Sequence, residues 1–169
     1  MSLPRPPAPG STAPAFVLPD LEGVPRRPLD GGPGSGGKVL IVFFKDDCPT
    51  CRYTLPVVGR IDRALGARGA RIFGVAQDDA VRSRAFAREH GLEFPILTDA
   101  PDHAVSRAFG IATVPTLVLA AGDGIVARTV SGFGRTEIEA MARDLAEGIG
   151  APVPRLFQGE DEVPETRPG

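Results

Sequence analysis

The chain has 169 residues, 42% of them hydrophobic, and a formal net charge of −2. This length and composition suit one globular domain with a buried core. Because the charge is near zero, with no basic block and no apolar run as long as a membrane span, we expect neither nucleic acid nor a membrane as a partner. The first residues also lack the apolar core of a secretory signal, so we expect a cytoplasmic protein.

Composition divides the chain into three parts. Residues 1–14 are crowded with proline and show no periodicity, which predicts a loose, proline-rich N-terminus. Residues 150–169 are rich in proline and acidic side chains, which predicts a flexible C-terminal tail. Residues 15–149 carry the alternating apolar runs of a single folded domain.

The first part of the domain contains one short predicted strand, a glycine-rich connector and one longer predicted strand. Residues 15–18 form a short apolar run that predicts an edge strand, paired with residues 28–29. Residues 31–37 are mostly glycine and predict a flexible connector, without the Gly-Lys-Ser/Thr ending of a phosphate-binding loop. Residues 38–44 are almost wholly apolar and rich in β-branched and aromatic side chains, which is typical of a central strand covered on both faces.

That strand leads directly to the only two cysteines of the chain, in the motif Cys48-Pro49-Thr50-Cys51. A helical pattern follows at once, interrupted early by Pro56. Its apolar face consists of Leu55, Val58, Ile61 and Leu65. A cysteine at the start of a helix lies among unpaired N–H groups, at the end of the helix dipole that favours a thiolate. In a reducing compartment, two cysteines at this spacing are catalytic or metal-binding rather than a structural crosslink.

The next elements alternate between strand and helix. Residues 71–76 read as a buried strand, and Asp78 or Asp79 can cap a helix that runs to His90 and ends at Gly91. The side chains predicted to face inward on this helix are Val81, Ala85 and Phe86.

The last part of the domain is predicted to be a short helix, a hairpin and a final helix. Residues 94–99 are extended and residues 102–109 form the short helix. Residues 116–120 and 125–130 read as an antiparallel pair. Thr136 opens a capping-box pattern for the final helix. Strands alternating with helices, followed by a hairpin and a helix, predict an α/β fold with a mixed central sheet flanked by helices.

These residues resemble the thioredoxin superfamily over roughly residues 16–148. The resemblance rests on the Cys-x-x-Cys motif at a strand-to-helix junction, on Pro56 five residues after Cys51, and on Val114-Pro115-Thr116 before a strand. Residues 84–99 narrow it to two neighbouring branches. One branch holds the thioredoxins of cytochrome c maturation, and the other holds the bacterioferritin-comigratory peroxiredoxins.

The resemblance implies a thiol–disulfide oxidoreductase with a thioredoxin-like fold. Cys48 would attack a substrate disulfide as a thiolate, and Cys51 would resolve the mixed disulfide. Pro115 would be a cis-proline beside the cysteines, in a loop that pairs with a substrate backbone. The expected substrate-binding residues are Pro49, Thr50, Val114 and Pro115.

The expected partners are a disulfide-containing protein or small molecule and an unidentified recycling reductant. No cofactor is expected beyond a redox-active Cys48–Cys51 disulfide. No metal is expected. Structural zinc takes four ligands, and the only candidates beside the two cysteines, His90 and His103, sit in polar helix-end surroundings typical of surface residues.

The chain departs from both branches near the cysteines. Val42 stands where thioredoxins have a buried aspartate, Asp47 where they have a tryptophan, and Thr54 where the cytochrome-maturation branch has a glutamate. No usual proton acceptor for Cys51 is therefore present. The residues expected to modulate the two cysteines are Lys45, Asp46, Asp47 and Thr54.

Two other functions remain open. In a peroxiredoxin-like thiol peroxidase, Cys51 would be the peroxide-reactive cysteine. Phe44 and Cys48 then replace the proline and threonine of that branch, and Ala112 and Thr113 stand where its activating arginine is expected. Since peroxide chemistry needs oriented donors, these replacements make it the second choice. The third possibility is a non-catalytic binding module with a thioredoxin fold.

Overall fold

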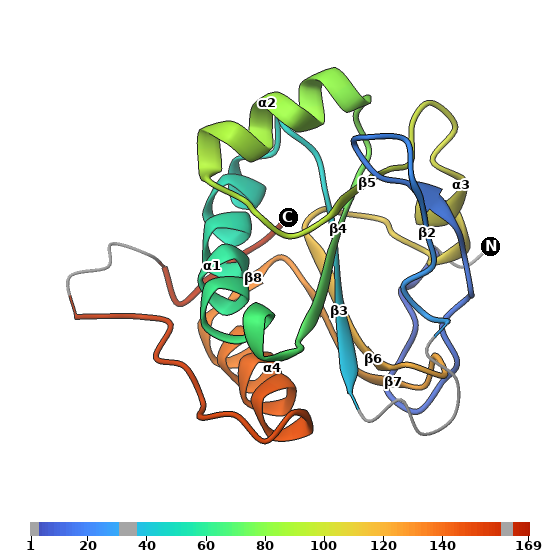
Figure 1. Ribbon diagram of the computed structural model, residues 1–169. Helices are drawn as coiled ribbons and strands as arrows, with labels where there is room; N and C mark the ends of the chain where they lie inside the picture. Colours follow the sequence, from blue (N-terminus) through green and yellow to red (C-terminus); the bar gives the residue numbers. More distant parts are fainter. Residues whose placement is uncertain (1–3, 31–36, 160–163) are drawn as a thin grey trace.

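The computed structural model describes residues 4–30, 37–159 and 164–169, so most of the predicted glycine-rich connector lies outside the described residues. No helix in the described part of the chain is long and apolar enough to cross a membrane. A five-stranded sheet forms the centre of the domain (Figure 1). In sheet order its strands are β5 (Ile96–Thr98), β4 (Arg71–Ala76), β3 (Lys38–Phe44), β6 (Thr116–Ala121) and β7 (Val126–Ser131).

The sheet is mixed. Strand β3 runs parallel to β4 and antiparallel to β6, while β4 and β5 are parallel and β6 and β7 antiparallel. The helices are α1 (Pro49–Leu65), followed by a short 3-10 turn η1 (Gly66–Arg68), α2 (Ala80–His90), α3 (Ala104–Ala108) and α4 (Arg135–Gly148). Helices α1 and α4 lie on one side of the sheet, and α3 lies on the other with the N-terminal segment (Figure 1). The predicted α/β fold with a mixed sheet flanked by helices is confirmed.

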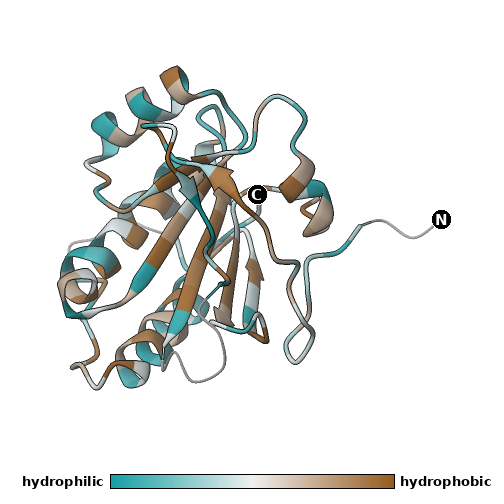
Figure 2. Cartoon of the chain, turned by 45° about the vertical axis from the view of Figure 1, so that its right-hand side comes forward, coloured by the Kyte–Doolittle hydropathy of each residue, from teal (hydrophilic) through white to brown (hydrophobic). Residues whose placement is uncertain are grey.

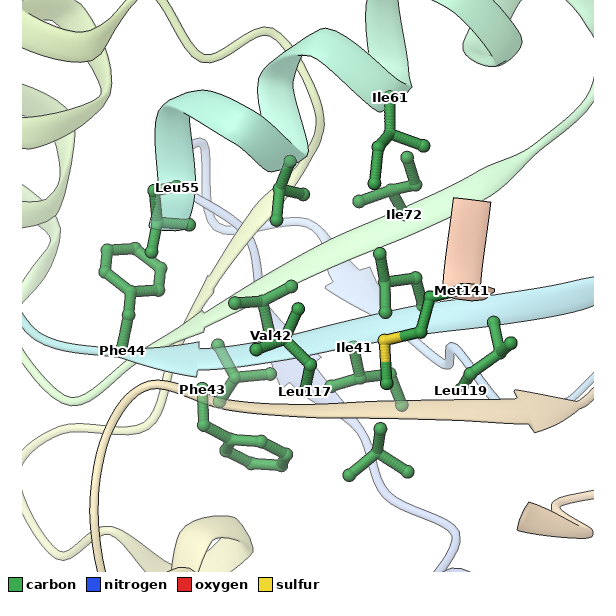
Figure 3. Close-up of a cluster of buried hydrophobic side chains, with 14 of the residues drawn as sticks. Ile41, Val42, Phe43, Phe44, Leu55, Ile61, Ile72, Leu117, Leu119 and Met141 are labelled. Carbon is green, nitrogen blue, oxygen red and sulfur yellow. The ribbon is translucent and has the colours of Figure 1, made fainter. Parts of the chain in front are cut away.

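The core is built around β3, whose residues 39–44 are all completely buried. Alternate side chains of this strand point to opposite faces of the sheet. Phe44 points towards Leu55 of α1, whereas Phe43 points to the other face, where its ring lies 5.0 Å from that of Phe109 (Figure 3). Figure 2 shows the hydrophobic residues concentrated on the central strands. Complete burial of each large apolar side chain stabilises the fold by about 1.5–3 kcal/mol.

The predicted edge strand pairs with a different partner from the one expected. Strand β1 (Leu18–Pro19) pairs with β2 (Pro25–Arg26) rather than with residues 28–29. The Asp20 carboxylate closes this turn, because it accepts hydrogen bonds from the backbone N–H groups of Glu22 and Val24 and pairs with Arg26 at 2.9 Å. A side chain within the turn therefore sets the register.

The N-terminal segment, which its proline content predicts to be loose, makes backbone hydrogen bonds to the hairpin. The backbone N–H groups of Gly10 and Ala13 donate to Val126 and Gly124, and Ser11 accepts a hydrogen bond from Val126. These backbone hydrogen bonds place the segment alongside the β6–β7 hairpin, like an additional edge strand. Proline-rich sequence fits this position because one side of an edge segment needs no donors.

The C-terminal segment is likewise packed on the domain where the structure describes it. Leu156 and Phe157 are buried, and the Phe157 ring meets Phe133 edge-on at a centroid distance of 6.2 Å. Strand β9 (Thr166–Arg167) pairs with β8 (Phe133–Gly134), and this part of the chain ends beside α1 (Figure 1). The segment predicted to be a flexible tail therefore contacts the domain within residues 151–159 and 164–169.

Candidate active site

Cys48 lies where β3 has ended and α1 begins. It is the N-cap residue of α1, with an extended backbone, and its Sγ accepts the N–H of Cys51 at 3.1 Å. Pro49, the first helical residue, has no N–H to leave unpaired. The sulfur of Cys48 therefore lies at the helix terminus that favours negative charge, and the backbone holds it there.

Cys51 lies one turn into α1 and has a different environment. Its side chain is completely buried. Burial, and then the hydrogen bond with Cys48, raise the pKa of the Cys51 thiol well above its ordinary value. A backbone hydrogen bond from Lys45 and the charge of its ammonium group offset part of this increase. The thiolate is therefore disfavoured at Cys51.

The loop before β6 closes the site from the opposite side. The Val114–Pro115 peptide bond is cis, as the resemblance implied. The Cys48 thiol donates to the Val114 carbonyl at 3.3 Å, so this loop contacts the first cysteine directly. The Gly132 N–H donates to the Pro115 carbonyl at 2.8 Å. This bond holds the loop against the end of strand β7.

Two acidic residues precede Cys48, and the structure gives them different partners. The Asp46 carboxylate is held by the Arg82 guanidinium through two hydrogen bonds of 2.8 and 2.7 Å. The Asp46 N–H donates to Asp78, whose carboxyl pKa is raised by burial. Asp47 is exposed and lies 3.8 Å from the Lys45 ammonium. Asp46 is thus part of a network that fixes the loop to α2, whereas Asp47 faces solvent.

The positions that lack a proton acceptor are filled by side chains without a carboxylate. Val42 is completely buried within β3, and Thr54 is completely buried within α1. The Thr54 hydroxyl donates to the Thr50 carbonyl at 2.8 Å, an ordinary interaction within a helix. Among the described residues, the groups that act on the ionisation of Cys51 are Cys48 and Lys45.

A pocket of about 380 Å³ opens beside Cys48. Its walls come from the loop before α1, the end of β4, the loop before β6 and the C-terminal segment. Residues around it include Lys45, Asp47, Cys48, Gln77, Thr113 and Gly169. In the described residues, no group of three or more His, Cys, Asp or Glu side chains could hold a metal ion. Of the two cysteines, only Cys48 lines this pocket.

All four expected substrate-binding residues lie at this site. Pro49 and Val114 line the pocket, Pro115 follows Val114 in the cis bond, and Thr50 is buried beneath the C-terminal segment. Sequence reasoning missed Arg82 and Gly169. The i, i+4 spacing of Asp78 and Arg82 was a signal for the first, whereas no local signal pointed to the second.

A mixed sheet in this strand order, with a Cys-x-x-Cys pair at the start of a helix and a cis-proline loop against the first cysteine, defines a thioredoxin-like oxidoreductase. The AhpC/TSA family matches residues 9–129, and the chain belongs to this family of the thioredoxin superfamily.

Relatives come from both branches that the sequence resembles. The chain is 32% identical over 124 residues to the thiol-disulfide oxidoreductase ResA of Geobacillus thermodenitrificans, which covers 73% of this chain and 69% of the relative. It is 31% identical over 91 residues to the chloroplastic peroxiredoxin Q of Sedum lineare, which covers 53% of this chain and 47% of the relative.

A solved structure from Chlorobium tepidum, assigned as the thiol:disulfide interchange protein DsbE, superposes with a TM-score of 0.72 at 25% identity. The match covers 88% of this chain and all of that one. The fold and family expected from the sequence are thereby confirmed.

Proposed function

We propose that the protein exchanges electrons with disulfide substrates through the Cys48–Cys51 dithiol. The observation that carries this proposal is the contrast between the two sulfurs. Cys48 caps α1 and accepts the Cys51 N–H, whereas Cys51 is completely buried with a raised thiol pKa. The Cys48 sulfur is suited to attack as a thiolate, and the Cys51 sulfur lies beside it, where it can resolve the mixed disulfide. The names of the ResA and DsbE relatives agree with this chemistry.

The exchange has two steps that balance. The Cys48 thiolate attacks one sulfur of the substrate disulfide, forms a mixed disulfide and releases the other substrate sulfur as a thiolate. Cys51 then loses its proton and attacks the Cys48 sulfur, which forms the Cys48–Cys51 disulfide and releases the second substrate thiolate. Two electrons pass to the substrate. In the opposite direction, the same steps oxidise a dithiol substrate.

The position of two residues supports their proposed binding roles. Pro49 and Val114 border the open pocket beside Cys48, so a substrate sulfur that reaches Cys48 contacts both. No cofactor beyond the dithiol is part of the proposal. The recycling reductant and the cytoplasmic location stay predictions.

A thiol peroxidase is the second candidate, and the peroxiredoxin Q relative favours it. It would require Cys51 to react with peroxide as an accessible thiolate. Cys51 has neither property, since its side chain is completely buried and its thiol pKa is raised. Thiol–disulfide exchange through Cys48 therefore has the stronger support.

Two cysteine variants separate the candidates. With Cys51→Ser, the mixed disulfide between Cys48 and a disulfide substrate should accumulate, because no thiol remains to resolve it. With Cys48→Ser, little mixed disulfide should form. Intact-mass measurements after separate incubations with oxidised glutathione and with insulin read out both results.

The same variants test the peroxidase candidate in a hydrogen peroxide assay. Cys48→Ser should consume hydrogen peroxide far more slowly than a peroxidase centred on Cys51 would. Peroxide consumption by Cys48→Ser at the wild-type rate would overturn the exchange mechanism and select the peroxidase. Failure of every variant and of the wild type to react with either substrate would leave only the binding module.

A further inference from the structure

The C-terminal strap, residues 164–169, lies across one side of the candidate active site. Its strand β9 pairs with β8, and the Glu165 carbonyl accepts the Arg135 N–H at 2.9 Å. The Arg167 guanidinium lies 4.7 Å from the centre of the Tyr53 ring on α1. Backbone pairing and a cation–π contact together hold the strap in one position.

The last two residues of the strap reach the residues around Cys48. The Thr50 hydroxyl, between the two cysteines, donates to the Pro168 carbonyl at 2.7 Å. Gly169 lies so close to the loop before β6 that an added Cβ would be 2.4 Å from the Val114 carbonyl oxygen. That same carbonyl accepts the Cys48 thiol. The strap therefore occupies the surface next to the attacking sulfur.

The fit between strap and domain requires backbone to approach backbone. At Gly132, on the domain side, an added Cβ would be 2.6 Å from the Arg167 carbonyl oxygen. Glycine stands on both sides of the contact where a side chain would separate the two surfaces. A second polypeptide cannot lie along Val114 and Thr50 while the strap is there.

The route that remains open is the pocket of about 380 Å³, of which Gly169 forms one wall. This volume is at the lower end of the range for small-molecule sites. Lys45 and Asp47 place one positive and one negative charge at its rim. These charges complement a small disulfide whose halves carry both an ammonium group and a carboxylate.

We infer that the C-terminal strap selects the substrate: it excludes extended polypeptide from Cys48 and leaves a pocket that admits one half of a small zwitterionic disulfide. This inference rests on the proposed function, since the reaction is the same two-step exchange. The strap adds no chemical step. It determines which disulfides reach the Cys48 sulfur.

The test compares two disulfides in single-turnover reactions of the reduced protein. Oxidised glutathione is the small zwitterionic probe and insulin is the protein probe. The fraction of Cys48–Cys51 disulfide formed over time is read by thiol alkylation and intact mass, so no recycling partner is needed. The variants are a chain that ends at residue 163 and the full chain with Gly169→Ala, whose Cβ would push the strap away from Val114.

Both variants should react with insulin at least about fivefold faster, because the strap no longer has to leave before the protein binds. Their rate with oxidised glutathione should fall, because the pocket loses a wall. The matched control is Gly159→Ala, where an added Cβ meets nothing within 4 Å, and both rates should equal those of the wild type.

Arg167→Ala provides a variant that loosens the strap without altering the pocket, and it should move the ratio of the two rates in the same direction. An equal increase with both disulfides would overturn the inference in favour of a general obstruction. An unchanged ratio in all three variants would overturn it outright. If the proposed function itself fails, the wild type forms no Cys48–Cys51 disulfide with either probe.

Discussion

The two cysteines are three residues apart, yet the fold gives their sulfurs opposite roles. Cys48 receives a backbone N–H and lies at the edge of an open pocket, whereas Cys51 is completely buried. Thioredoxins use a buried carboxylate to take the proton from the second cysteine. Val42 and Thr54 stand at the positions expected for such a group, so the proton of Cys51 must leave by another route.

The pH dependence of the second step follows from this arrangement. Because the pKa of the Cys51 thiol is raised, its thiolate fraction should increase about tenfold for each pH unit between pH 6 and pH 9. The rate at which Cys51 resolves a mixed disulfide should increase in proportion. The measurement uses protein whose Cys48 carries 2-nitro-5-thiobenzoate, which absorbs visible light when Cys51 displaces it.

Cys51→Ser is the control, and it should release no chromophore by this intramolecular route at any pH. A rate that levels off as the pH approaches 9 would contradict the prediction. Such levelling would place the pKa of Cys51 in its ordinary range, about 8.5.

At the scale of elements, helix α2 holds the loop that carries Cys48. Its first turn supplies Arg82, which binds the Asp46 carboxylate, and the preceding Asp78 binds the Asp46 N–H. These contacts cross from the end of β4 to the end of β3. The N-terminus of α1 is therefore positioned from two sides, by its own strand and by α2.

Arg82→Gln should slow the attack of Cys48 on a disulfide by roughly three- to tenfold, because the loop before the cysteine loses its fixed position. Arg82→Lys should restore part of the rate, since lysine keeps the charge but not the two-point geometry. The observable is the second-order rate constant of the reduced protein with oxidised glutathione. Arg88→Gln, on the same helix, is the control, because the ion pairs of this region among the described residues involve Arg52 and Arg82 but not Arg88. Equal rates for all four proteins would refute this role.

The boundaries of α2 were predictable from the sequence, but its buried face was not. Asp79 caps the helix and Gly91 ends it, as predicted. Val81 and Ala85 were predicted to face inward, yet both are exposed, and the buried residues are Ser83, Phe86 and Ala87. A short helix with few apolar residues has no unique amphipathic phase, so tertiary contacts decide its rotation.

The start of α4 was also placed incorrectly. The capping-box pattern at Thr136 predicted the start there, but the helix begins at Arg135 after the N-cap residue Gly134. Strand β8 immediately precedes this helix and pairs with the distant strap. A pairing with residues more than thirty positions away leaves no local pattern in the sequence. The sequence could therefore indicate Cys48, Cys51 and Pro115, whereas the strap and Arg82 reach the site only through contacts between distant parts of the chain.

At the scale of the whole molecule, residues 4–14 extend the sheet beyond its edge strand β7. Their hydrogen bonds run along β7 and the hairpin turn, and the Thr129 hydroxyl donates to the Pro7 carbonyl at 2.5 Å. The backbone of Arg5 lies directly against Gly110, after α3. The N-terminal segment should therefore contribute to stability.

Two glycines with nearly equal backbone angles test this contribution. Gly110 has φ +64° and Gly91 has φ +63°, so alanine is strained to a similar degree at both. Only at Gly110 would the new Cβ collide with another segment, the backbone of Arg5. Gly110→Ala should cost about 1–3 kcal/mol more than Gly91→Ala in free energy of unfolding, measured by urea titration. Equal losses would show that residues 4–14 contribute nothing.

The position of Gly169 has a practical consequence for fusion proteins. Any polypeptide joined after this residue would emerge at the rim of the Cys48 pocket, between the loop before β6 and the start of α1. An affinity tag or reporter placed there would crowd the reactive thiol and could loosen β9 from its partner strand. The same sequence attached ahead of residue 4 would emerge near α3, on the opposite side of the sheet from α1 (Figure 1). Redox rates measured on the two fusions should therefore differ, even though the folded domain between them is identical.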